Sequence, residues 1–182
     1  MLTIKVPGGR FWNEDTQEFI YTKAQTLVLE HSLLSLSKWE SKYHKPFLSE
    51  KQKTNDELID YIRFMTINKV EDDLVYLVLG EENLLKIKEY IDDPMTATWF
   101  SDANKRSPKK RVVTAELVYY WIFSLGINKE CEKWHFNRLI TLIKVFEAEN
   151  EAASGKNKLK GKALYDRNSA ISKANRARMR KH

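Results

Sequence analysis

The sequence has little cysteine, and it lacks long apolar runs. Cys131 is the single cysteine among 182 residues, which excludes an internal disulfide and favours a reducing compartment such as the cytoplasm. No run of about 18 apolar residues occurs, so no membrane-spanning helix and no membrane partner are expected. The first residues, MLTIKVPGG, lack the apolar stretch of a secretory signal.

Strong catalytic motifs are also missing. Glu40 and His44 are spaced i, i+4 and could form a general acid–base pair. No nucleophile or second polar cluster lies nearby in the sequence, so an ordinary pair on a helix surface is the preferred interpretation. The PGGR stretch at 7–10 lacks the spacing of a phosphate-binding loop. We therefore expect no enzyme and no cofactor.

A metal site has little support either. Cys131 and His135 are spaced i, i+4 and could supply half of a zinc site. A structural zinc site needs four ligands, and the chain holds one cysteine and four histidines. Cys131 is therefore expected to be a small buried side chain, and no metal ion is expected.

Charge is distributed unevenly along the chain. Residues 154–182 contain ten Lys and Arg and one acid, a net charge of +9, whereas the preceding body has 21 basic and 24 acidic residues. Such a tail can contact nucleic acid or an acidic protein, or it can be a solvated end that aids solubility. With Tyr165 as the only aromatic residue after Phe146, the tail could neutralise phosphates without reading bases. The candidate contact residues in the tail are Lys156, Lys158, Lys160, Lys162, Arg167, Arg176, Arg178 and Arg180.

Short β-branched and aromatic segments fill the first 31 residues. TIKV, RFWN, EFIYT and TLVLE are separated by PGG and EDTQ, which are typical turn residues. They predict a small antiparallel meander that packs on helices. We expect an α+β fold, mostly α, with a single domain at 1–153 (meander about 1–31, helical body 32–153) and a flexible basic linker and tail at 154–182.

Helical periodicity begins at Ser32 and ends before Pro46, although a capping box of Ser37 with Glu40 would start this helix later. Thr54 and Glu57 form a capping box for a second helix, whose predicted inward stripe is Leu58, Ile59, Ile62 and Met65. A short helix at 72–79, ended by Gly80, and another at 81–91 follow, the latter with Leu84, Ile87 and Ile91 inward.

The last part of the body predicts a helical hairpin. Residues 92–111 contain two prolines and a polar run, which favours an exposed loop. Thr114 caps a helix closed by Gly126, and Asn128 caps a long helix over about 129–153. The short connection between these two helices predicts an antiparallel pair.

Aromatic residues are the remaining feature to explain. Trp39, Tyr43 and Phe47 are spaced by four and line one helix face and its exit, so they are core residues or a docking face for a helical partner. Four aromatic residues surround the helix that starts at Thr114. More than one face of this helix should therefore be covered by other parts of the protein or by a second copy in a homo-oligomer.

Three runs together suggest a family: LEHSLLSLSKWESKYHKPFL, KTNDELIDYIRFMTI and TAELVYYWIFSLGI…CEKWHFNRLITLIKV. With the ending RNSAISKANRARMRK, they resemble proteins of tailed bacteriophages described as tail assembly chaperones, from roughly Leu27 to the end. The resemblance implies a non-enzymatic chaperone in the host bacterial cytoplasm. It would bind the helical tape-measure protein, assist assembly of tail-tube subunits, and be absent from the finished virion. The family offers no catalytic residues.

Two other functions remain open at this stage. The protein could bind nucleic acid through its basic tail, which predicts steeply salt-dependent binding that is lost when 154–182 is deleted. Alternatively, it could be a structural virion component such as a connector or minor tail protein.

Overall fold

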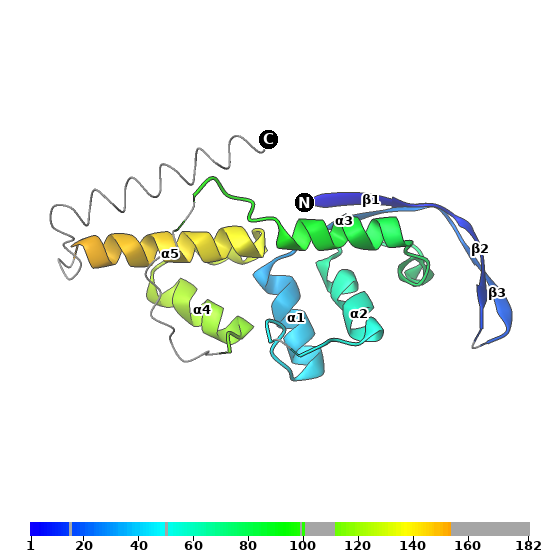
Figure 1. Ribbon diagram of the computed structural model, residues 1–182, viewed down its shortest axis with the longest axis horizontal. Coiled ribbons are helices and arrows are strands. Elements are labelled where there is room, and N and C mark those ends of the chain that lie inside the picture. Colours follow the sequence, from blue (N-terminus) through cyan, green and yellow to red (C-terminus); the bar gives the residue numbers. More distant parts are fainter. Residues whose placement is uncertain (15, 50, 99, 101–111, 154–182) are drawn as a thin grey trace.

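The computed structural model describes residues 1–14, 16–49, 51–98, 100 and 112–153. Four strands come first and helices follow, so the predicted α+β fold, mostly α, is confirmed. The molecule is elongated, with two helices, α4 and α5, at one end and a β-ribbon at the other (Figure 1). The predicted basic tail lies outside the described residues.

The strands form one long hairpin in two segments. Strand β1 (Leu2–Val6) pairs antiparallel with β4 (Gln25–Leu29), and β2 (Gly9–Asn13) pairs antiparallel with β3 (Glu18–Thr22). The antiparallel arrangement is as expected, but the connectivity differs from a meander because β1 and β2 do not pair with each other.

A close approach between Gly8 and the segment 22–24 on the opposite side of the hairpin explains this connectivity. A Cβ atom at Gly8 would lie 2.6 Å from the Ala24 nitrogen and 2.8 Å from the Thr22 oxygen, so a larger residue would not fit. The Pro7–Gly8 stretch therefore bends the ribbon instead of reversing the chain. The reversal occurs in the predicted polar turn, where Gln17 has a φ of 54°.

Helix α1 (Leu33–Tyr43) begins at Ser32, whose side chain accepts from the Ser35 backbone in a reciprocal capping box. This earlier cap excludes the alternative start at Ser37. The helix ends at Tyr43, and its C-cap His44 has a left-handed φ of 52°, two residues before Pro46.

The capping box of Thr54 and Glu57 is confirmed at the start of α2 (Asn55–Met65). The predicted inward stripe is partly wrong, because Leu58 is exposed whereas Asp60 is buried. Helix α1 lies on the buried side of α2 and supplies hydrogen bonds to the carboxylates there, which makes their burial possible.

A 3-10 helix, η1 (Asp73–Tyr76), replaces the longer helix predicted at 72–79. Gly80 is the N-cap of α3 (Glu81–Asp92) rather than the end of the preceding element. On α3, Leu84 is exposed against expectation, while Ile87 and Tyr90 are buried.

The predicted caps of α4 (Ala115–Ser124) are confirmed, since Thr114 accepts from the backbone at its start and Gly126 has a φ of 66° just after its end. Asn128 caps a 3-10 helix, η2 (Lys129–Lys133), rather than a long α-helix.

The last helix, α5 (Phe136–Ala153), therefore starts later than expected. The Phe136 backbone nitrogen donates to the His31 carbonyl oxygen at 2.7 Å, which ties the start of α5 to the residues just before α1. The segment containing η2 leads the chain back toward α1, so α4 and α5 run toward the same end of the molecule (Figure 1). The predicted antiparallel hairpin is wrong for this reason.

A continuous core joins the ribbon to the helices. Strands β1 and β4 contribute their inward residues, and every α-helix adds at least one buried apolar side chain. The largest fully buried side chains are Trp39, Tyr61, Leu27, Leu29, Leu33, Leu36, Met65, Ile122 and Leu139.

Trp39 offers a direct test of this core. Its side chain is 1% exposed, and its indole Nε1 donates to the Glu57 carbonyl oxygen at 2.8 Å. We expect Trp39→Ala to lower the free energy of unfolding by about 3–5 kcal/mol, because it leaves a cavity and removes the indole hydrogen bond to the Glu57 carbonyl oxygen. Tyr120→Ala, at a site that is 65% exposed, is the control and should cost less than about 1 kcal/mol. Urea unfolding measures both, and equal losses would contradict this assignment.

Candidate functional site

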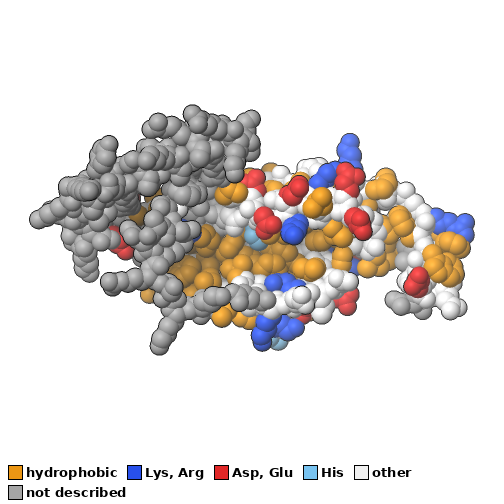
Figure 2. Space-filling model, viewed as in Figure 1, with side chains coloured by type: hydrophobic (Ala, Val, Ile, Leu, Met, Phe, Trp, Pro, Cys, Tyr) orange, Lys and Arg blue, Asp and Glu red, His pale blue; other side chains and the backbone are white. Residues whose placement is uncertain are grey.

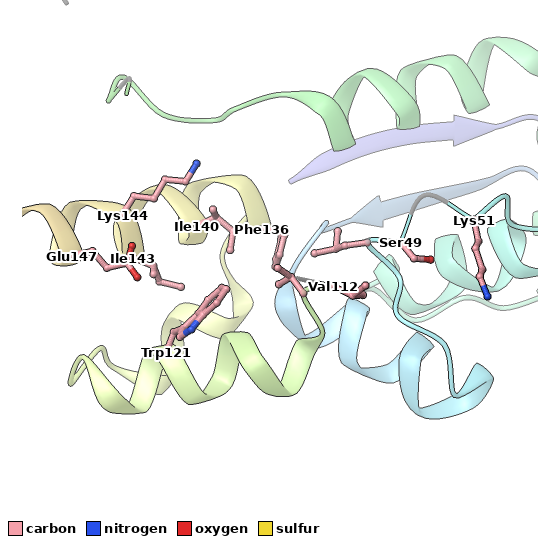
Figure 3. Close-up of a pocket in the computed structure, with 11 residues that line it drawn as sticks. Ser49, Lys51, Val112, Trp121, Phe136, Ile140, Ile143, Lys144 and Glu147 are labelled. Atoms are coloured by element: carbon pink, nitrogen blue, oxygen red, sulfur yellow. The ribbon is translucent and has the colours of Figure 1, made fainter. Parts of the chain in front are cut away.

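An apolar groove lies between α4, α5 and two segments that lead out of α1 and into α4 (Figure 3). Its volume is about 990 Å³. The segment after α1 and the segment before α4 form one side, and the inward faces of α4 and α5 form the other. The apolar lining residues are Leu48, Val112, Val113, Trp121, Phe136, Ile140 and Ile143.

Charged and polar residues stand at the edge of the groove. Lys144 and Glu147 come from α5, and Ser49 and Lys51 come from the segment after α1. Lys51, Lys144 and Glu147 are exposed. Since the lining is mostly apolar, the arrangement suits the burial of an apolar surface.

Glu40 holds two sides of this groove together. Its Oε1 accepts the Phe47 backbone N–H at 2.7 Å, and its Oε2 accepts the Ala115 backbone N–H at 2.7 Å. Phe47 directly precedes the lining residue Leu48, and Ala115 is the first residue of α4. The carboxylate also lies at the positive end of the α4 dipole.

The prediction that Glu40 and His44 form a pair on the helix surface is wrong for Glu40. Glu40 is buried, at 7% exposure, so it is not a helix-surface residue. It tolerates burial because both carboxylate oxygens accept backbone hydrogen bonds. His44 is exposed, as expected, and caps the end of α1.

The three candidate docking residues on and after α1 pack together inside the molecule. The centroid of the Trp39 ring lies 4.8 Å from that of Tyr43 and 5.1 Å from that of Phe47. The Phe47 and Tyr61 ring centroids are 4.0 Å apart. Trp39 is fully buried, while Tyr43 and Phe47 are half-buried. These contacts are those of core residues, which is one of the two interpretations that the spacing allowed.

Charges tie this aromatic cluster to α2. The Tyr43 hydroxyl donates to the Asp60 carboxylate at 2.6 Å, and this hydrogen bond raises the pKa of Tyr43 to about 12. Burial opposes ionisation of Asp60, but hydrogen bonds from Lys42 and Tyr43 outweigh it and lower the pKa of its carboxyl. Lys45 in turn pairs with Glu57 at 2.6 Å. The cluster therefore joins α1 to α2 and stabilises the fold.

Two buried histidines lie behind the groove. His31 and His135 have ring centroids 5.1 Å apart, and the His31 ring also contacts Phe136 of the groove lining at 5.6 Å. His135 Nε2 donates to the Tyr90 carbonyl oxygen at 2.9 Å, so its proton resides on Nε2. His31 Nδ1 makes a 2.5 Å hydrogen bond with the Tyr61 hydroxyl.

Both imidazoles are held neutral. Burial lowers the pKa of His31 to about 3, and the neighbouring His135 adds to this effect. Burial also lowers the pKa of His135, against an opposing hydrogen bond to the Tyr90 carbonyl. The carboxylates of Glu30 and Asp93 also act to raise the pKa of His135, but burial outweighs them. The pair is therefore a structural element that favours neutral pH.

The alternative of a half zinc site at Cys131 and His135 gains no support from the fold. Cys131 is buried in η2, as expected of a small buried side chain, and His135 lies beyond η2 with its Nε2 on Tyr90. Across the described ranges, no group of three or more His, Cys, Asp or Glu side chains is placed to hold a metal ion.

The candidate residues of the basic tail, from Lys156 to Arg180, lie outside the described residues. So does most of the predicted exposed loop at 92–111, of which the described part after α3 is irregular. Sequence reasoning missed the groove residues Leu48, Val112 and Ile140. The nearest signal was the apolar character of α4, which indicates that this helix needs cover but does not identify these three residues.

No protein-family model, no curated protein and no solved structure matches this chain. Among the helices that the structure describes, none combines the length and the hydropathy needed to cross a membrane.

The position of Glu40 predicts a measurable cost of removing its charge. In Glu40→Gln, the amide oxygen can accept one backbone N–H, and the amide NH2 is left facing the other. We expect a loss of about 1–3 kcal/mol in the free energy of unfolding. Glu89→Gln, an exposed site on α3, is the matched control. Urea unfolding of both variants gives their free energies of unfolding. Indistinguishable unfolding midpoints would contradict a stabilising role of the Glu40 carboxylate.

The buried histidine pair predicts a pH dependence. Because folded His31 has a pKa of about 3 against an ordinary 6.5, the unfolded chain binds more protons as pH falls below 6.5. We expect the free energy of unfolding to fall by up to about 1.4 kcal/mol per pH unit from His31 between pH ~6 and ~4.5. This slope should flatten in His31→Gln and persist in His44→Gln, where the side chain is exposed. Chemical unfolding at several pH values gives the slope, and an unchanged slope in His31→Gln would contradict the assignment.

Proposed function

We propose that this protein is a non-enzymatic phage tail assembly chaperone that holds an apolar helix face of the tape-measure protein in the groove between α4 and α5. The groove is the observation that carries the proposal. The resemblance of the sequence to such chaperones suggests the partner, and the groove is where the described part of the chain could receive it. Its place of action would be the cytoplasm of the infected host, before the virion is complete.

The chemistry of the groove fits an amphipathic helix. Such a helix presents an apolar stripe with charged residues on both sides, which matches an apolar lining with lysines and a glutamate at its edge. Hydrophobic side chains also form a band across the middle of the face in Figure 2, with charged side chains on both sides of the band. Covering such a surface with a partner helix would remove apolar area from water on both molecules.

Two lining residues can be changed without disturbing the core. Leu48 is 43% exposed and Val112 is 53% exposed, so an aspartate at either position can remain solvated in the free protein. We expect Leu48→Asp and Val112→Asp to reduce the amount of soluble tape-measure protein recovered on co-expression at least tenfold, because the charge would be desolvated on binding. The measurement is co-purification of a tape-measure protein with the tagged chain.

Leu77→Asp is the matched control, since Leu77 is 57% exposed and lies outside the groove. It should leave recovery unchanged, and circular dichroism should show all three variants folded. A tape-measure protein that stays insoluble with the unaltered chain would overturn the proposed function. Recovery that is equally high in all three variants would place the binding surface elsewhere.

A further inference from the structure

The distal part of the ribbon carries an exposed row of four side chains on one face. Arg10 of β2 lies opposite Tyr21 of β3. Two residues farther along β2, Trp12 lies opposite Phe19. Since alternate residues of a strand share a face, all four lie on the same side of this two-stranded sheet. In Figure 1 this segment, the β-arm (residues 9–22 apart from 15), curves away from the helices at the end opposite α4 and α5.

The four side chains contact one another. The Arg10 guanidinium lies over the Phe19 ring at 3.4 Å from its centroid and 5.9 Å from the Tyr21 ring. The Trp12 ring meets Phe19 edge to face at 4.9 Å. Such packing orders the row before any partner arrives, so less conformational entropy is lost on binding.

This row is poorly covered in the single chain. Trp12 is 52% exposed, Phe19 45% and Tyr21 67%. A two-stranded hairpin is marginally stable on its own, and adjacent exposed aromatic residues on one face mark an interaction surface. The opposite face of the arm is better covered, since Phe11 is half-buried and Thr22 is buried.

Charge along the arm shows which partner fits. Glu14 follows Trp12 by two positions near the turn, and Lys23 follows Tyr21 by two positions toward the body. Glu14 comes directly after β2 and Lys23 directly after β3, so the two lie at opposite ends of the arm, and both are exposed. The row therefore has an acid at its outer end and two cations, Arg10 and Lys23, toward its inner end. A surface of this kind is complementary to a copy of itself turned end for end.

We propose that the β-arms of two copies of this chain pack face to face, in opposite directions, about a twofold axis. The aromatic side chains of one arm cover those of the other. Glu14 of each copy then lies against Arg10 and Lys23 of the other copy. A single-stranded nucleic acid suits the arm less well, because the acidic side chain of Glu14 at its outer end would repel phosphates. This inference does not depend on the proposed function, because the groove takes no part in it.

Sedimentation velocity of the full chain at micromolar concentration tests the dimer. We expect a species of twice the 21.5 kDa of one chain, which Trp12→Ser converts to monomer. Tyr120→Ser is the matched control, since Tyr120 is 65% exposed on α4, and it should leave the dimer intact. A monomer throughout for the unaltered chain would overturn the proposal. So would a dimer that Tyr120→Ser disrupts and Trp12→Ser does not.

A charge exchange tests the direction of packing. Glu14→Lys and Lys23→Glu each place like charges opposite one another at both contacts between positions 14 and 23 of a twofold dimer, so each variant alone should be monomeric at low salt. Mixed in equal amounts, they restore opposite charges at both contacts and should form a heterodimer. Failure of the mixture to associate, with both variants folded by circular dichroism, would reject this arrangement of the arms.

Discussion

One buried carboxylate joins the parts of the molecule on which the groove depends. The side chain of Glu40 on α1 accepts one hydrogen bond from the Phe47 backbone N–H and another from the Ala115 backbone N–H. These residues are 68 positions apart, and each stands next to a segment that lines the groove. A carboxylate without such partners would not be buried here, so the same hydrogen bonds satisfy the charge and position the two segments.

Local signals in the sequence were sufficient for most helix starts. Thr54, Thr114 and Asn128 each cap a helical segment at the predicted position, because a side-chain oxygen beside a free backbone N–H is a short-range interaction. Gly126 closes α4 for a similarly local reason, its positive φ. The spacing of Trp39, Tyr43 and Phe47 also placed them on one face of a short stretch, but it left open whether that face is core or docks a partner. Their ring contacts and the burial of Trp39 favour the core.

Long-range contacts account for what sequence reasoning missed. The burial of Glu40 depends on Ala115, which no local pattern connects to α1. The late start of α5 depends on the His31 carbonyl oxygen, which draws Phe136 toward α1 and leaves η2 as a short 3-10 turn. The long hairpin in two segments depends on Gly8 and Ala24 coming close together, whereas the residues PGG alone resemble a turn. In each case the deciding partner lies far away in the sequence.

The groove and the β-arm lie at opposite ends of the molecule, which bears on how the two proposals combine (Figure 1). Two copies joined through their arms would leave both grooves unobstructed and far apart. A long helical partner with repeated apolar stretches could then occupy both grooves, and the second contact would form at the high effective concentration set by the first. Each groove could therefore bind weakly and release its helix readily, while the dimer as a whole keeps hold of the partner. Readily reversible contacts of this kind suit a chaperone that must give up its partner when assembly proceeds.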